Sequence, residues 1–153
     1  MEAKKIIVTG GANRIGRSIA LELASYDTQI VIHYSKSFIA AKKLKIELED
    51  LGSVVHLLKV DLNNLRQTQR VISYAHKKMK GLDCLINNAS IFENDNLINF
   101  SEKSFLKHMN INLKAPAILI QNFAKVCKGN KGNVVNIIDQ RVEKLTPFFF
   151  SYT

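Results

Sequence analysis

Short apolar runs alternate with longer stretches of helical periodicity along the whole chain. The apolar runs predict five strands, at residues 5–8, 29–33, 54–60, 82–86 and 133–138. Strands that are apolar at nearly every position are typical of parallel sheets, because helices cover both faces of such a sheet. The alternation therefore predicts an α/β fold, namely a doubly wound parallel sheet.

Helices are expected between these strands, where apolar side chains recur every three or four residues. They are predicted at residues 14–25, 37–51, 65–81 and 105–126. In the second helix, Ala41, Leu44, Leu48 and Leu51 form the apolar face, and Pro116 predicts a kink in the last one. No repeat, low-complexity tract or linker interrupts the pattern, so residues 1–153 are expected to form a single domain.

The net charge of +9 raises the question of a nucleic-acid partner. The lysines of residues 42–45 and 77–80 belong to two different predicted helices, and no aromatic residues interleave with them as a base-stacking surface requires. We interpret them as solvated helix faces and expect no nucleic acid. A basic nucleic-acid-binding module is the distant alternative.

Several classes of protein are disfavoured by the composition. No apolar run reaches the roughly 18 residues of a membrane-spanning helix, and the charged start lacks the features of a signal peptide. The two cysteines, Cys84 and Cys127, stand among apolar residues and are interpreted as buried free thiols. A cytoplasmic protein without membrane contact is therefore expected, and no metal site is predicted.

A glycine-rich turn, Thr9–Gly16, follows the first predicted strand and opens the first helix. Glycines at Gly10 and Gly16 allow a tight turn and a close approach of pyrophosphate to the helix N-terminus, where free N–H groups favour anions. An ordinary turn would also accept these glycines. The position between strand and helix favours a dinucleotide site that includes Arg14 and Ile15.

The end of the second predicted strand indicates which dinucleotide is bound. An NAD enzyme has Asp or Glu here, but this chain has no acid until Glu47. It offers Lys36 and the hydroxyls of Ser35 and Ser37, which together with Arg14 can surround a 2′-phosphate. NADPH is therefore the predicted cofactor.

Together these segments resemble the short-chain dehydrogenase/reductase family, and the resemblance covers essentially the whole chain. It implies a Rossmann fold and gives roles to further residues. Asp61 and Leu62 match the adenine-binding acidic position, and Asn112 and Tyr152 match the proton-relay asparagine and the catalytic tyrosine. The remaining implied cofactor contacts are Tyr34, Asn88, Ala89 and Ser90.

Three departures from the family pattern resemble its pteridine reductase branch. Arg14 replaces the middle glycine, Ser90 is followed two residues later by Phe92, and Asp139 stands where most members have a serine. The resemblance implies that Phe92 stacks on a pterin ring and that Asp139 joins Tyr152 at the reacting centre. A small pteridine- or folate-like substrate is expected, and a carbonyl-reducing member of the family is the alternative.

The family places a lysine four residues after its tyrosine, which would be position 156, whereas this sequence ends at Thr153. The last strands and helices of the family are therefore expected to be missing, and the chain alone is expected to be inactive or nearly so. A non-catalytic remnant of such an enzyme is a further alternative. The full-length family implies a homo-oligomer.

Overall fold

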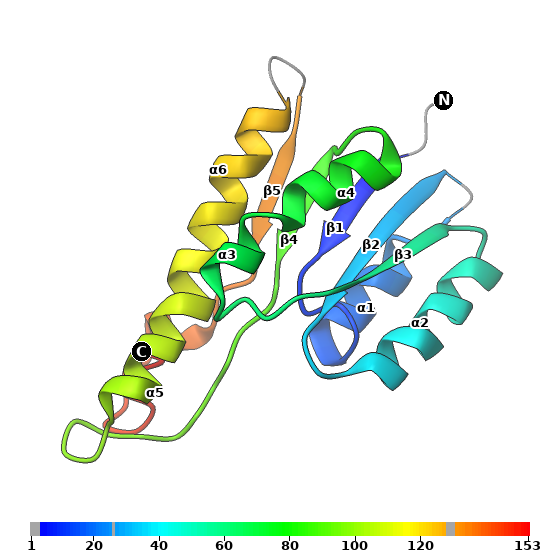
Figure 1. Ribbon diagram of the computed structural model, residues 1–153. Coiled ribbons are helices and arrows are strands. Elements are labelled where there is room, and N and C mark those ends of the chain that lie inside the picture. Colours follow the sequence, from blue (N-terminus) through cyan, green and yellow to red (C-terminus); the bar gives the residue numbers. More distant parts are fainter. Residues whose placement is uncertain (1–3, 26, 128–130) are drawn as a thin grey trace.

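The computed structural model describes residues 4–25, 27–127 and 131–153. In this part of the chain, five strands form one parallel sheet in the order β3-β2-β1-β4-β5 (Figure 1). The strands are β1 (Lys4–Val8), β2 (Thr28–Tyr34), β3 (Val54–Lys59), β4 (Cys84–Asn87) and β5 (Asn133–Asn136). All five predicted strands are confirmed, with ends that shift by one or two residues. The chain crosses over from β3 to β4, so the strand order reverses between the neighbouring strands β1 and β4. In α/β sheets, ligands bind in the crevice outside the carboxyl ends of the strands at such a point.

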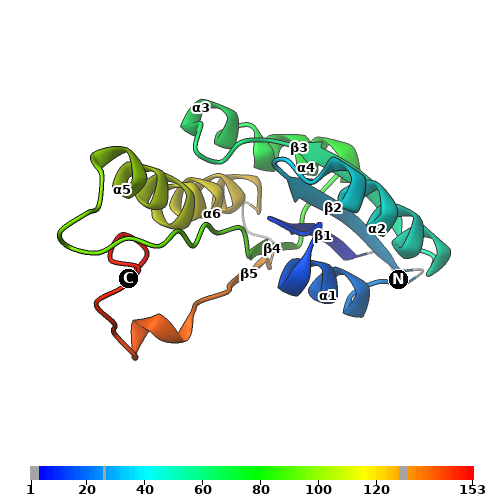
Figure 2. The same cartoon turned by 90° about the horizontal axis from the view of Figure 1, so that it is seen from below.

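Two helical layers cover the sheet. The helical elements are α1 (Arg14–Glu22), α2 (Phe38–Asp50), α3 (Leu65–Thr68), α4 (Val71–Met79), α5 (Glu102–His108), the π-helical segment η1 (Met109–Lys114), α6 (Ala115–Cys127) and the 3-10 turn η2 (Gln140–Val142). Ile6 and Val8 of β1 pack with α1 and α2, whereas Ile7 packs with α4 and α6. Figure 2 shows α1 on one side of the sheet and α4 and α6 on the other. The predicted doubly wound arrangement is confirmed.

The predicted helix at 65–81 is two helices, α3 and α4, which are separated by Gln69 and Arg70. The hydroxyl of Thr68 donates to the carbonyl of Asn64 at 3.1 Å, and such local bonds compete with the helical ladder. In the preceding helix, Leu51 is the C-cap and is 48% exposed, so its placement on the apolar face was wrong.

The long helix at 105–126 is broken differently from the predicted proline kink. A π-helical segment, η1, lies between α5 and α6. It ends at Lys114, two residues before Pro116. In an α-helix the N–H of residue 116 would donate to the carbonyl of Asn112, and proline has no N–H to give. The wider π turn accommodates this missing bond.

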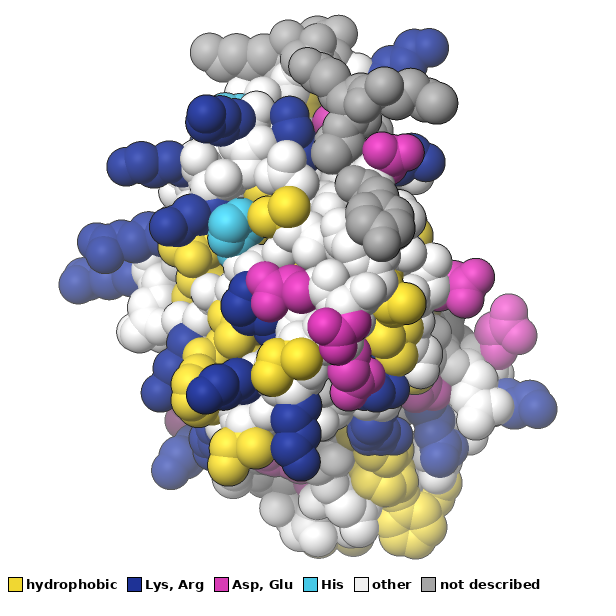
Figure 3. All heavy atoms as spheres, turned by 90° about the vertical axis from the view of Figure 1, so that its right-hand side faces the viewer, with side chains coloured by type: hydrophobic (Ala, Val, Ile, Leu, Met, Phe, Trp, Pro, Cys, Tyr) yellow, Lys and Arg dark blue, Asp and Glu magenta, His cyan; other side chains and the backbone are white. Residues whose placement is uncertain are grey.

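The charged surface agrees with the interpretation as solvated helix faces. The lysines of residues 77–80 are exposed, as are Lys42 and Lys43 on α2. In Figure 3, Lys and Arg side chains are spread over the visible face, with Asp and Glu among them near its middle. Both cysteines are free as predicted, but each is only half-buried. No helix in the described ranges has the length and apolar character needed to cross a membrane.

Candidate cofactor and active site

A cavity of about 720 Å³ opens at the carboxyl ends of the strands. Its lining includes every residue predicted to contact the cofactor: Gly10, Arg14, Ile15, Gly16, Tyr34, Ser35, Lys36, Ser37, Asp61, Leu62, Asn88, Ala89 and Ser90. Phe92, Asp139 and Tyr152 line the same cavity. The fold therefore gathers the predicted cofactor, substrate and catalytic residues in one place, with the exception of Asn112.

The glycine turn is tied to the end of β4. The Asn88 amide donates to the carbonyls of Thr9 and Gly10 at 2.9 and 3.1 Å, and the Thr9 hydroxyl accepts from the backbone N–H groups of Asn88 and Ala89. A Cβ atom on Gly16 would overlap the Gly10 carbonyl and lie 2.5 Å from the Asn88 amide nitrogen. The Asn88 side chain thus holds the turn in shape. The atoms around Gly16 leave no room for a side chain at that position.

Arg14 occupies the glycine-like position of this turn. Its φ of 50° lies in the left-handed region, which costs a residue with a Cβ roughly 1–2 kcal/mol. The side chain is exposed and lines the cavity at the start of α1. A strained residue that brings a cation to a helix N-terminus suits an anionic ligand.

His33 also contributes to this turn, a role that the sequence analysis missed. The imidazole is 2% exposed; its Nδ1 accepts from the Gly10 N–H at 3.1 Å, and its Nε2 lies 3.1 Å from the Val60 carbonyl. Burial lowers the pKa of His33 to about 4, so the ring is neutral and Nε2 carries the proton. The sequence signal for this role was a histidine, His33, directly after the apolar residues 30–32 of the strand.

The residues after β2 form the basic side of the cavity. Ser35 and Lys36 are exposed, and Ser37 is half-buried before α2. Tyr34 and Leu62, in contrast, are 7% and 4% exposed and pack in the core, so their side chains support the site from behind. A bound dinucleotide phosphate fits this arrangement, because the cations and hydroxyls stand free at the cavity and the glycines keep the turn open.

The candidate catalytic pair lies at the far end of the cavity. The Tyr152 hydroxyl donates to Oδ2 of Asp139 at 3.1 Å, while Oδ1 of Asp139 accepts from the Arg141 N–H at 2.9 Å. Burial, the hydrogen bond to Asp139 and the negative charge of Asp139 raise the pKa of Tyr152, and Arg141 opposes this. A phenol is protonated at neutral pH even at its ordinary pKa of about 10, so Tyr152 carries a proton there.

Aromatic rings surround the Tyr152 side chain. Phe92 meets the Tyr152 ring edge-on with centroids 4.7 Å apart, and it stacks on Phe149 with centroids 4.0 Å apart. Phe92 nevertheless remains 49% exposed where it lines the cavity. The exposed part of the Phe92 ring adds an apolar surface to the cavity that Tyr152 also lines.

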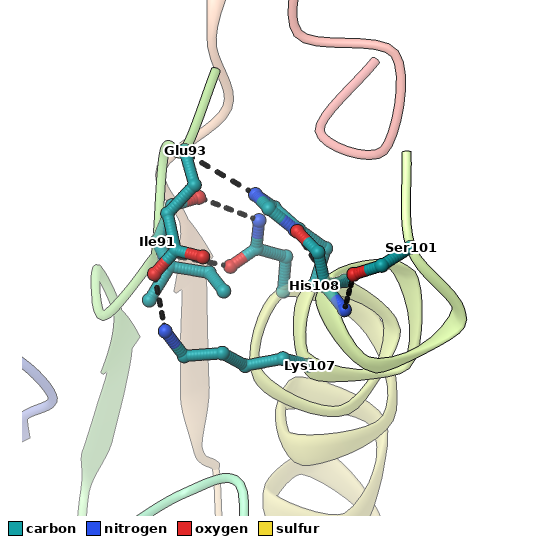
Figure 4. Close-up of polar contacts among 7 residues, drawn as sticks. Ile91, Glu93, Ser101, Lys107 and His108 are labelled. Carbon is teal, nitrogen blue, oxygen red and sulfur yellow. Dashed lines mark hydrogen bonds and ion pairs between the residues drawn. The ribbon is translucent and has the colours of Figure 1, made fainter. Parts of the chain in front are cut away.

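Asn112 holds the loop that carries Phe92 rather than lining the main cavity. Its amide donates to the Ile91 carbonyl at 3.0 Å and accepts from the Ile91 N–H at 2.9 Å. Figure 4 shows the same loop held again at Glu93, whose N–H donates to Nε2 of His108 and whose carboxylate pairs with Lys107. Asn112 does line a smaller neighbouring cavity together with Tyr152. Its side chain has a positioning task, and its part in a proton relay stays a prediction.

Comparison with known proteins identifies the family. A model described as short chain dehydrogenase matches residues 4–153. The chain belongs to the short-chain dehydrogenase family. A short-chain dehydrogenase/reductase of Aspergillus aculeatus, AacuN, is 31% identical over 108 residues, which are 71% of this chain and 41% of that protein. Galactitol 2-dehydrogenase of Agrobacterium fabrum is 25% identical over 139 residues, 90% of this chain and 53% of that protein.

Solved structures of short-chain dehydrogenases share the fold. FolM alternative dihydrofolate reductase 1 from Brucella canis, complexed with NADP, is 35% identical with a TM-score of 0.89, over 97% of this chain and 60% of that chain. A short chain dehydrogenase from Burkholderia cenocepacia in complex with NADP is 26% identical with a TM-score of 0.89, over 95% and 59% of the two chains. The chain thus spans between about two fifths and three fifths of the length of these relatives.

Proposed function

We propose that residues 1–153 form one NADPH-binding unit of a reductase that acts on a C=N bond of a pteridine or dihydrofolate-type ring. The observation that carries the proposal is the Tyr152–Asp139 hydrogen bond, at 3.1 Å, in the same cavity as Phe92 and the glycine turn. This combination provides a proton donor, a carboxylate and a flat aromatic surface around one point.

The preference for NADPH is proposed from the charges at the cavity. Arg14 and Lys36 are exposed cations that line it, and Ser35 and Ser37 add hydroxyl groups beside Lys36. A 2′-phosphate gains charge-assisted hydrogen bonds from such groups, whereas the 2′-hydroxyl of NADH does not. The NADP complexes of the Brucella canis and Burkholderia cenocepacia proteins support this assignment.

The reaction needs a hydride at carbon and a proton at nitrogen. The nicotinamide supplies the hydride when the cofactor is bound. The Tyr152 phenol, which is protonated at neutral pH, supplies the proton. The Asp139 carboxylate can accept from the amino-pyrimidine edge of a pterin, and Phe92 can stack on its ring. The similarity to an alternative dihydrofolate reductase over 97% of the chain supports this choice of substrate.

Carbonyl reduction is the second candidate, favoured by the similarity to galactitol 2-dehydrogenase. A carbonyl oxygen needs hydrogen-bond donors around it, which a serine offers at the position of Asp139. An ionised Asp139 only accepts hydrogen bonds and repels the negative charge that develops on oxygen. The carboxylate therefore favours a substrate that presents N–H groups.

Binding experiments on the purified chain test both halves of the proposal. Isothermal titration with NADPH and NADH should show the tighter affinity for NADPH, and Lys36→Ala should weaken NADPH binding by about tenfold while leaving NADH unchanged. Lys43→Ala, an exposed lysine on α2, is the matched control. Equal affinities for the two cofactors in the wild-type chain would refute the NADPH preference.

The substrate half is tested with the NADPH-saturated chain and a panel of a dihydropteridine, dihydrofolate and a ketone. We expect the two pteridine-ring ligands to bind, and Asp139→Ser to weaken them by about tenfold without changing NADPH affinity. Binding of the ketone alone would favour the carbonyl-reducing candidate. Turnover of the same panel with NADPH then tests the reaction.

A further inference from the structure

One buried carboxylate joins the loop that carries Phe92 to the segment that carries Tyr152. Asp95 is 7% exposed and Ser151 is 1% exposed. The Ser151 N–H donates to Oδ1 of Asp95 at 3.0 Å, and the Ser151 hydroxyl donates to Oδ2. The N–H of Phe150 donates to the Asp95 backbone carbonyl at 3.3 Å. Asp95 thus accepts three hydrogen bonds from the two residues that precede Tyr152.

Asp95 has no ion-pair partner among the described residues, where the ion pairs join Arg17 to Glu47, Lys45 to Glu49 and Lys107 to Glu93. Burying a carboxylate is costly unless hydrogen bonds replace the water that it loses. Here those hydrogen bonds come from Ser151. The interaction is therefore stable only while this short segment stays in one position relative to Asp95.

The loop that carries Asp95 is itself fixed on α5 and η1. Its first residues are held by Asn112 at Ile91 and by His108 at Glu93, as Figure 4 shows. His108 is fully buried, and its Nδ1 lies 2.9 Å from the Ser104 carbonyl. Hydrogen bonds at Ile91 and Glu93 therefore tie the loop to the helix, and those at Asp95 tie the loop to Ser151.

The segment beyond Phe149 has few other polar attachments. The Thr153 N–H donates to the Phe149 carbonyl at 2.9 Å, which closes a local turn but ties it to nothing outside itself. Among the described residues, the remaining polar attachment is the Tyr152–Asp139 bond. The Phe150 ring also packs against the rings of Phe100 and Phe105. Without Asp95, the position of the Tyr152 phenol would depend on that single exposed hydrogen bond and on ring contacts.

We propose that Asp95 is a positioning residue for Tyr152: it fixes Ser151 so that the phenol hydroxyl reaches Asp139 and the ring edge meets Phe92. The loop of residues 91–95 then fixes the position of the Phe92 ring relative to the Tyr152 phenol. The role of Tyr152 as proton donor rests on the proposed function, whereas its placement by Asp95 does not.

The test uses the chain labelled with ¹³C at the ring Cζ of its four tyrosines, with the Tyr152 resonance assigned from Tyr152→Phe. Asp95→Ala should move the Tyr152 Cζ shift toward that of a solvated phenol and lower its pKa toward the ordinary value of about 10. NADPH affinity should stay within about twofold, and dihydropteridine affinity should fall by about tenfold. Asp83→Ala is the matched control, because Asp83 also accepts from a backbone N–H, that of Lys5, but at the opposite end of the strands.

Ser151→Ala provides a second variant if Asp95→Ala does not fold, and Ser151→Thr should restore the wild-type Tyr152 shift because it keeps the hydroxyl. An unchanged Tyr152 shift and pKa in Asp95→Ala would overturn the proposal, as would an equal loss of NADPH affinity, which would indicate a role in the whole fold. If the Tyr152 shift moves but no dihydropteridine binds to any variant, the positioning role holds and the pteridine function fails.

Discussion

The phenol of Tyr152 donates a hydrogen bond to Oδ2 of Asp139, while Oδ1 of the same carboxylate caps the turn η2. An aspartate at the start of a turn is common for structural reasons alone, because its oxygen satisfies a free N–H. Here the cap also fixes the direction of the second oxygen. Asp139 thus caps the turn with one carboxylate oxygen and accepts from the Tyr152 hydroxyl with the other.

We predict that Asp139→Asn lowers the pKa of Tyr152 toward its ordinary value, because the negative charge and the phenol–carboxylate bond both raise it. A phenol whose pKa is raised on folding contributes stability below the unfolded pKa of about 10 and loses it as pH rises through the folded pKa. The variant should therefore lose less stability between pH 9 and 11, measured by urea unfolding. An identical alkaline profile in both proteins would contradict this. Asparagine keeps the cap, so η2 should remain.

Stability in acid should depend on His33. Its pKa falls from 6.5 to about 4 on folding, so the unfolded chain binds a proton that the folded chain does not take up between these values. The associated stability is complete above pH 6.5 and is lost as pH falls to 4, by about 3 kcal/mol. His33→Gln, which can hydrogen-bond but does not titrate, should lack this difference in urea unfolding between pH 7 and 4.

Replacing Arg14 by glycine should raise stability and weaken cofactor binding at once. The left-handed φ of 50° is strained for arginine and open to glycine, so the free energy of unfolding should rise by about 1 kcal/mol. The NADPH dissociation constant should rise about tenfold through loss of the cation. Arg14→Ala removes the charge but keeps the strain, so it should show only the second effect. A gain of stability in the alanine variant would argue against strain at this position.

Gly16→Ala should disrupt the turn. The added methyl overlaps the Gly10 carbonyl and crowds the Asn88 amide, which holds the turn to β4, so unfolding should become easier by about 2 kcal/mol. NADPH affinity should fall at least tenfold, measured by calorimetry. Ser18→Ala, on the exposed side of the same helix, should change stability by less than about 0.5 kcal/mol. Wild-type stability in Gly16→Ala would show that the turn can widen.

Much of the fold follows from local patterns. Each strand is a short apolar run and each main helix a three-to-four periodicity, and these depend only on neighbouring residues. The errors occur where one side chain alters the local ladder, at Thr68 between α3 and α4 and at Pro116 after η1. The helical periodicity does not reveal where single hydrogen bonds interrupt a helix, because the apolar positions continue across the interruption.

The alternation of strands and helices, the glycine turn and the basic residues after β2 could be predicted from the sequence, since all of these are contiguous in the chain. The packed fold was needed to show that His33 bonds Gly10 and Val60, residues 23 and 27 positions away, and that Asp95 holds Ser151, 56 positions away. A hydrogen bond between distant residues exists only after packing has brought two backbones together. The Tyr152–Asp139 pair combines both levels: the sequence placed the two residues after β5, and the packed loop at Asp95 set the segment in which Tyr152 reaches the carboxylate.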